Sequence, residues 1–120
     1  MLVIRKEQME VFRAYMLEQF ENRMLTHLRS AFPDQARDMP ELDLRSLIHT
    51  GIENADKYGI VDEVDIRHYL EYMLIYGLDF DTNPSTSWAG IILRNPELTG
   101  TDKMAQIDDH DFFTRVGDQP

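Results

Sequence analysis

Three oxygen-bearing side chains at alternate positions are the feature of this sequence that most suggests chemistry: Asp79, Asp81 and Asn83. Their spacing matches the first three ligand positions of an EF-hand calcium loop. That motif needs a glycine at its sixth position for a sharp turn and a glutamate at its twelfth to bind the ion through both oxygens. Here the sixth position is Pro84 and the twelfth is Gly90. We therefore predict no metal at this segment.

The same segment, the Asp79–Trp88 loop, can instead be a stiff structural corner. Asn83 before Pro84 is typical of a helix cap followed by proline at the first helical position. Asp79 and Asp81 can accept hydrogen bonds from backbone N–H groups in a tight turn. The two aromatic residues of the loop, one of them the only tryptophan, would then anchor it to the core. The candidate residues for this structural role, or for binding a partner, are Asp79, Phe80, Asp81, Asn83, Pro84 and Trp88.

Motifs of the common enzyme classes are missing from the sequence. There is no nucleophile elbow, no His-Glu-x-x-His, no phosphate loop, no Glu-x-x-His pair for a di-iron bundle and no cysteine. The run Asp108-Asp109-His110-Asp111 is acidic, but consecutive residues on a helix point in different directions. Asp65 with His68, and His49 with Glu53, share helix faces and are expected to be solvated or salt-bridged. We predict no catalytic residue, no cofactor and no enzyme.

Charge limits the classes of partner. The 120 residues carry a net charge of −10, and residues 61–120 hold twelve of the acidic side chains against four basic ones. An acidic chain is repelled by nucleic-acid phosphates and by anionic membrane surfaces. No run approaches the roughly 18 apolar residues of a membrane span, and the first residues lack the pattern of a signal peptide. We therefore expect a cytoplasmic protein that binds neither nucleic acid nor membrane.

The elements that must position these residues are predicted to be helices. The first is a long helix between Lys6 and Ala31, a stretch without glycine or proline. Pro33 ends it, because the residue before a proline avoids helical geometry. A short connection follows up to Pro40, with at most a single helical turn. The predicted buried stripe of the long helix recurs about every fourth residue, at Phe12, Met16, Phe20, Met24 and Leu28, and is widened by Met9, Tyr15, Leu25 and Phe32.

The second and third helices are predicted from caps and periodicity. Asp43 is the expected N-cap of the second helix, and Gly59 marks its end. The third helix begins near Asp62 and stops at Gly77. It is apolar on nearly all sides, which is typical of a helix at the centre of its domain. A buried strand is the competing interpretation of that apolar run.

Two further helices are expected after the Asp79–Trp88 loop. The fourth is short, and Asn95-Pro96 closes it and can cap another turn. The last runs from about Thr101 to Val116. The fourth helix is marked by Trp88, Ile91 and Ile92. In the last helix, the residues expected to face inward are Met104, Ile107, Phe112 (or Phe113) and Val116. The predicted fold is an all-α, compact bundle of about five helices with a long N-terminal helix and an apolar central third helix, in a single domain over residues 1–120.

Over nearly its whole length, the sequence resembles a group of small all-helical bacterial proteins encoded beside type VI secretion spike and effector genes. The segment from Tyr58-Gly59-Ile60 to Trp88-Ala89 carries the resemblance, and its most specific part is Phe80-Asp81 with Pro84 and Trp88-Ala89. Further agreement lies at Ile4 to Glu7, His27-Leu28 and Ala31-Phe32-Pro33. The chain departs from the group at Ser87, where the group has a second proline.

The resemblance implies a non-enzymatic, protein-binding accessory role in a bacterial secretion or toxin system, as an adaptor, a chaperone or an immunity-type protein. The implied partner is a protein, either an effector or a spike component. The alternative is a small helical enzyme or ligand-binding domain with a pocket at the Asp79–Trp88 loop. The sequence leaves the oligomeric state open.

Overall fold

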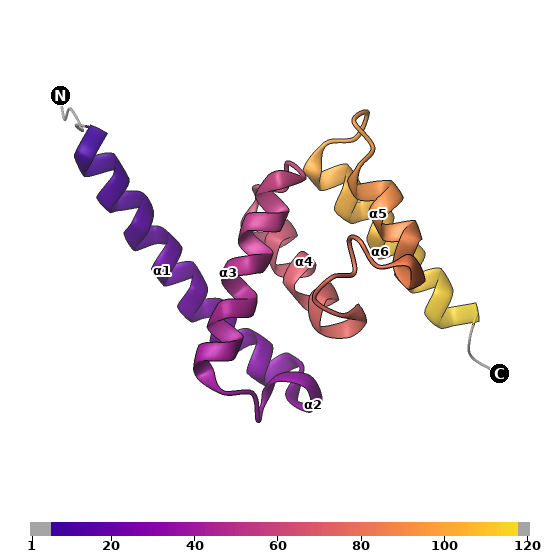
Figure 1. The fold of residues 1–120 in the computed structure, drawn as a ribbon, viewed down its shortest axis with the longest axis horizontal. Helices are drawn as coiled ribbons and strands as arrows, with labels where there is room; N and C mark the ends of the chain where they lie inside the picture. The colour runs from indigo at the N-terminus through magenta and orange to yellow at the C-terminus, as the bar shows by residue number, and fades with distance from the viewer. Residues whose placement is uncertain (1–5, 118–120) are drawn as a thin grey trace. The chain divides into compact units, whose positions relative to one another are not determined.

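The computed structural model describes residues 6–117, and side-chain exposure for residues 13–115. The regular elements of the described part are all helices, with no strand among them, which confirms the predicted all-α class (Figure 1). Its elements are α1 (Lys6–Ala31), α2 (Pro33–Ala36), α3 (Glu41–Lys57), α4 (Glu63–Tyr76), the 3-10 helix η1 (Pro84–Thr86), α5 (Ser87–Leu93) and α6 (Gly100–Gly117). The chain forms two compact units, residues 1–48 and residues 49–120. The single domain expected for residues 1–120 stays a prediction.

The first unit consists of α1, α2 and the first half of α3. Pro33 ends α1 as predicted and opens α2 as its first residue. The Arg29 guanidinium donates to the Met39 carbonyl oxygen at 3.0 Å, which ties the last turn of α1 to the chain that follows α2. The buried apolar residues of this unit are Phe20, Met24, Leu28, Ala36, Leu44, Leu47 and Ile48.

Two predictions about this unit are wrong. Of the stripe predicted for α1, Tyr15 is 58% exposed and Met16 is 43% exposed. Among the α1 residues whose exposure the structure describes, from position 13 on, burial starts at Phe20, and the single turn of α2 packs against α1. Asp43 is not an N-cap, since α3 already begins at Glu41 and Asp43 lies inside its first turn. The side chains of Met9 and Phe12 lie outside the described part.

The second unit is built around α4, whose helical conformation decides against the strand interpretation. The C-terminal half of α3 lies close to one side of α4, where a Cβ added at Gly51 would stand 2.2 Å from the Leu70 side chain. Helix α6 packs against α4 as well, and α5 lies beside α6 (Figure 1). α4 ends at Tyr76, before Gly77 with φ +116°, as the sequence predicts. The buried apolar residues of this unit are Ala55, Ile60, Tyr69, Leu70, Tyr72, Met73, Phe80, Ala89, Leu93, Met104 and Ile107.

The inward face of α6 differs in part from the predicted one. On α5, for which no inward face was predicted, Ala89, Gly90 and Leu93 are buried and Ile91 is 69% exposed. On α6, Met104 and Ile107 are buried as predicted, but Phe112 and Phe113 are both exposed. The reason on α6 is that the helix turns a carboxylate, Asp111, toward its neighbour in the position where a phenylalanine was expected. The side chain of Val116 lies outside the described part.

Within residues 6–117, no helix has both the length and the apolar composition that crossing a membrane requires.

Candidate functional site

The Asp79–Trp88 loop leaves α4 through overlapping backbone turns. The backbone N–H groups of Thr82 and Asn83 both donate to the Asp79 carbonyl oxygen, at 2.9 and 2.8 Å. The Asn83 side-chain oxygen then accepts from the Ser85 backbone N–H at 2.9 Å, with Pro84 as the first residue of η1. The predicted corner, an asparagine cap followed by proline, is therefore confirmed.

Asp81 is the buried acid of this loop, with 6% of its surface exposed. The Tyr58 hydroxyl donates to its Oδ2 at 2.7 Å, and the Arg94 guanidinium donates to its carbonyl oxygen at 2.9 Å. Burial, and then the contact with Asp81, raises the pKa of Tyr58, so the phenol stays protonated and able to donate. Helix α5 approaches so closely that a Cβ added at Gly90 would stand 2.7 Å from the Asp81 carbonyl oxygen. Gly90, which rules out the calcium motif, thus has a packing role.

The expected role of the two aspartate side chains in the loop is wrong. We expected both carboxylates to accept backbone N–H groups, but Asp81 accepts from a tyrosine hydroxyl, and Asp79 accepts from the Asn83 side-chain amide at 3.3 Å. The physical reason is that the Asp79 carbonyl oxygen already accepts the N–H groups of the turn. The carboxylates are therefore left for side-chain donors.

The two aromatic residues of the loop differ in burial. Phe80 is fully buried, and its ring centroid lies 5.0 Å from that of Tyr69 on α4. Trp88 is only partly buried. It meets Tyr76 edge-on at 5.4 Å and stacks on the His110 ring at 3.9 Å with the planes 8° apart. Phe80 is thus the core anchor, and Trp88 joins α5 to α4 and α6 near the surface.

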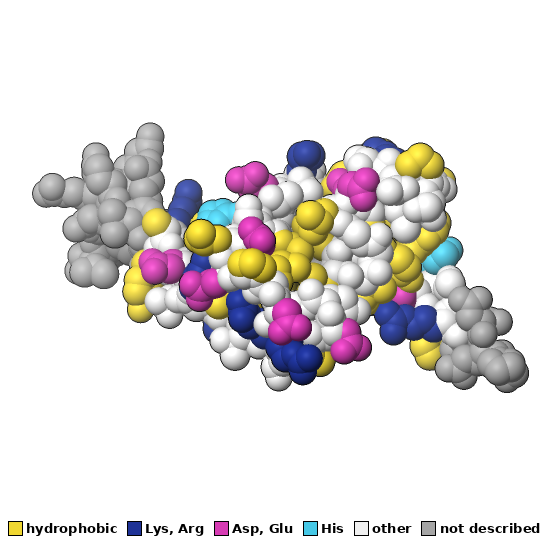
Figure 2. Space-filling model, turned by 60° about the horizontal axis from the view of Figure 1, so that its bottom comes forward, with side chains coloured by type: hydrophobic (Ala, Val, Ile, Leu, Met, Phe, Trp, Pro, Cys, Tyr) yellow, Lys and Arg dark blue, Asp and Glu magenta, His cyan; other side chains and the backbone are white. Residues whose placement is uncertain are grey.

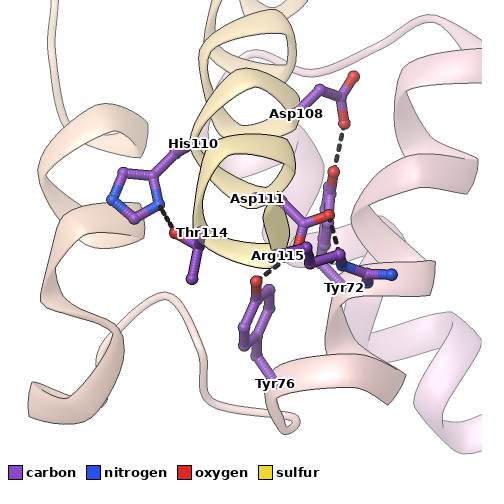
Figure 3. Close-up of polar contacts among 7 residues, drawn as sticks. All are labelled: Tyr72, Tyr76, Asp108, His110, Asp111, Thr114 and Arg115. Carbon is purple, nitrogen blue, oxygen red and sulfur yellow. Dashed lines mark hydrogen bonds and ion pairs between the residues drawn. The ribbon is translucent and has the colours of Figure 1, made fainter. Parts of the chain in front are cut away.

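A row of tyrosine–aspartate hydrogen bonds connects α4 to α6 (Figure 3). Within this row the Tyr72 hydroxyl donates to Asp108, and the Tyr76 hydroxyl donates to Asp111. His68 on α4 places its Nδ1 3.2 Å from Asp108 Oδ2, so this carboxylate contacts two α4 side chains. The interface between the two helices is therefore partly polar, with each carboxylate engaged.

The electrostatics of the row favour protonated tyrosines. Asp111 is buried, and Arg115 Nε lies 3.0 Å from its Oδ2 in an ion pair within α6. Burial, with the hydrogen bond to Asp111, raises the pKa of Tyr76 to about 12. Burial and the bond to Asp108 raise the pKa of Tyr72 further above its ordinary value. Near neutral pH both phenols are hydrogen-bond donors, so the row acts as a structural contact.

The acidic run on α6 does not gather around one point. Asp108 and Asp111 face α4, whereas His110 lies on another side of the helix, stacks on Trp88 and contacts Thr114 Oγ1 at 3.3 Å (Figure 3). Among the described residues, no three His, Cys, Asp or Glu side chains are grouped in a way that could hold a metal ion.

Further polar contacts hold the start of α6. The Thr101 hydroxyl donates to Asp65 Oδ2 at 2.7 Å, so Asp65, like His68 on the same helix, has a partner on α6. Lys103 is 8% exposed and donates from Nζ to the Tyr58 carbonyl oxygen at 2.8 Å, beyond the last residue of α3. A cation at the C-terminal end of a helix also interacts favourably with the helix dipole.

The tyrosines and their acceptors were missed in the sequence. Tyr72 and Tyr76 stand four residues apart on α4, and Asp108 and Asp111 stand three apart on α6. Such spacings place each set on one face of its helix. The matching of the two sets was the available signal for this contact, but the sequence does not show that these two faces meet.

Comparison of the chain with protein-family models, with curated proteins and with solved structures gives no match. The resemblance to proteins encoded beside type VI secretion genes therefore stays a prediction. Function has to be argued from the surface and the site of this chain.

Proposed function

We propose that this chain is a non-enzymatic protein-binding accessory protein of a bacterial secretion or toxin system, acting as an adaptor, a chaperone or an immunity-type protein. One observation carries the protein-binding part of the proposal, an exposed aromatic pair on α6. Phe112 is 61% exposed, Phe113 is 69% exposed, and their ring centroids lie 5.6 Å apart in an edge contact. Aromatic side chains are enriched at the centres of protein interfaces, where they anchor the partner.

The engagement of the polar groups supports a binding role over catalysis. Asp81, Asp108 and Asp111 each accept a hydrogen bond from a tyrosine of the same unit. A general base has to come within hydrogen-bond reach of the proton that it takes from the substrate. These carboxylates are instead used to join α6 and the Asp79–Trp88 loop to the rest of the second unit.

The nature of the partner rests on charge and on the sequence resemblance. The chain has a net charge of −10, and most of the excess of acidic over basic side chains lies in residues 61–120. Complementary charge favours a basic surface on the partner and raises the association rate. The resemblance implies that this partner is an effector or a spike component.

Co-purification with candidate effectors and spike components from the same gene cluster tests the proposal. We expect one of them to bind at micromolar concentration or tighter. A variant carrying Phe112→Ser and Phe113→Ser should weaken this binding at least tenfold without lowering the melting temperature. Ile91→Ser, at a position as exposed as Phe113, is the matched control and should bind normally.

Two results would contradict the proposal. One is that no candidate binds at micromolar concentration. The other is a melting temperature raised by a divalent metal or a sugar, with the rise abolished by Asp81→Asn, which would favour a ligand-binding pocket at the Asp79–Trp88 loop.

A further inference from the structure

A small cleft lies where α3 turns into α4, apart from the Asp79–Trp88 loop and from the tyrosine–aspartate row. Its volume is about 280 Å³. We call it the α3–α4 cleft, and its lining residues are Ile52, Glu53, Asp56, Ile60, Val61 and Ile66. All six belong to the second unit.

The walls of the α3–α4 cleft are aliphatic. Ile60 is 1% exposed, Ile52 and Ile66 are partly buried, and Val61 is 70% exposed. Small-molecule sites generally measure roughly 300–1,000 Å³ and carry a few polar groups that orient the ligand. This cleft is smaller, and its only polar side chains are two carboxylates. It therefore suits an aliphatic side chain of a protein partner better than a cofactor.

Those carboxylates belong to Glu53 and Asp56, which are both exposed. Among the described residues, neither side chain has a hydrogen-bond or ion-pair partner. Asp56 lies in the last turn of α3, which ends at Lys57. A negative charge is unfavourable there, because the C-terminus is the negative end of the helix dipole. The stability of α3 therefore does not explain the position of Asp56.

The surrounding chain extends this negative charge. Residues 51–66 contain five carboxylates and one cation, Lys57. Figure 2 shows one face of the molecule with side chains coloured by type, and apolar, acidic and basic side chains are all exposed on it. Charge of one sign around an apolar depression attracts ligands of the opposite charge and raises their local concentration.

We propose that the α3–α4 cleft binds a segment of a protein partner in which one aliphatic side chain is flanked by lysines or arginines. The aliphatic side chain enters between Ile52, Ile60 and Ile66, with Val61 at its edge. The flanking cations pair with Glu53 and Asp56. The inference rests on the proposed function and deepens it, since it names the chemistry by which the partner is recognised.

A titration of the full chain, followed by NMR of isoleucine methyl groups, tests this inference. The probe is a short glycine–serine peptide with one central leucine and two lysines on each side of it. We expect saturable shifts at Ile52, Ile60 and Ile66, with a Kd of about 1 mM or tighter. Replacing the leucine of the peptide by alanine should weaken binding at least tenfold.

Charge reversal provides the sharper test. The double variant Glu53→Lys and Asp56→Lys should no longer bind the lysine-flanked peptide. It should instead bind a matched peptide with glutamates in place of the lysines. The control with the same change in net charge is Asp102→Lys with Asp109→Lys, two exposed residues of α6, and it should bind as the unaltered protein does. Val61→Glu should abolish binding, whereas Ile91→Glu, at an equally exposed position, should not.

The inference is overturned if the alanine peptide binds as well as the leucine peptide, or if the charge-reversed variant keeps the lysine peptide. Self-association that Val61→Glu abolishes would also overturn it, because a second copy would then occupy the cleft. If the charge-reversed variant and Val61→Glu both still capture an effector or spike component, this inference is refuted and the proposed function is not. The proposed function fails separately, if no such component is captured by the unaltered protein.

Discussion

The Asp79–Trp88 loop and the α3–α4 cleft both combine carboxylates with apolar side chains, and they use them in opposite ways. In the loop, Asp81 is buried and accepts a hydrogen bond from Tyr58. At the cleft, Glu53 and Asp56 are exposed and have no side-chain partner in the described part of the chain. In the sequence the loop shows the spacing of a ligand site, yet its aspartates stabilise the fold. The cleft shows no motif in the sequence, yet its two carboxylates are exposed to solvent.

The largest effect should come from removing the anchor of the loop. Phe80→Ala deletes a fully buried ring that packs on Tyr69, and we expect a loss of about 3–5 kcal/mol of unfolding free energy. Urea unfolding followed by the fluorescence of Trp88, the only tryptophan, measures it. Val61→Ala at the exposed edge of the cleft should cost less than about 0.5 kcal/mol. A loss below about 1 kcal/mol for Phe80→Ala would show that the loop is not anchored by this ring.

The next effect concerns the buried acid. Asp81→Ala leaves the Tyr58 hydroxyl without its acceptor, so we expect a loss of about 2 kcal/mol. In a double-mutant cycle with Tyr58→Phe, the two changes should be non-additive by at least about 0.5 kcal/mol. Additive losses would mean that the hydrogen bond does not stabilise the loop. Glu53→Ala at the cleft is the comparison and should be nearly neutral.

A smaller effect should appear at alkaline pH, from the row that joins α4 and α6. The pKa of Tyr76 is raised to about 12 in the folded chain, against about 10 when unfolded. The contribution of the Tyr76 hydroxyl to the free energy of unfolding is fully present below pH about 10 and is lost as the pH rises through about 12. In that window the hydroxyl ionises readily only in the unfolded chain. Relative to Tyr76→Phe, the unaltered protein should lose about 1 kcal/mol across it, after allowance for solvent screening of a partly exposed group. Urea unfolding of both proteins at several pH values measures the difference, and parallel pH profiles would contradict it.

The smallest expected effect is a gain in the free energy of unfolding instead of a loss. Asp56→Asn removes a negative charge near the C-terminal end of α3, so we expect a gain of about 0.3–1 kcal/mol at low salt. The same change at position 81, Asp81→Asn, should instead destabilise. Melting curves at low and high salt separate the two, because screening should reduce the gain at position 56. A loss at both positions would remove the contrast between the loop and the cleft.

Local signals predicted the elements well and their contacts poorly. Pro33, Gly59 and Gly77 end helices where the sequence predicts, because proline and glycine act on the backbone within one turn. The Asn83 cap was predictable for the same reason. Periodicity was less reliable for burial. Tyr15 of α1 carries the apolar pattern but is exposed, because a stripe shows which face is apolar and not what covers it.

The sequence by itself determined that the chain is helical, that it is acidic and that the Asp79–Trp88 loop is a proline corner. Only the tertiary structure decided which side chains meet. The pairing of Asp81 with Tyr58 and of Asp111 with Tyr76 joins residues 23 and 35 positions apart. The same holds for the α3–α4 cleft, where Glu53 and Asp56 become neighbours of Ile66. Helix signals arise from neighbours in sequence, whereas burial and recognition depend on which faces the folded chain brings together.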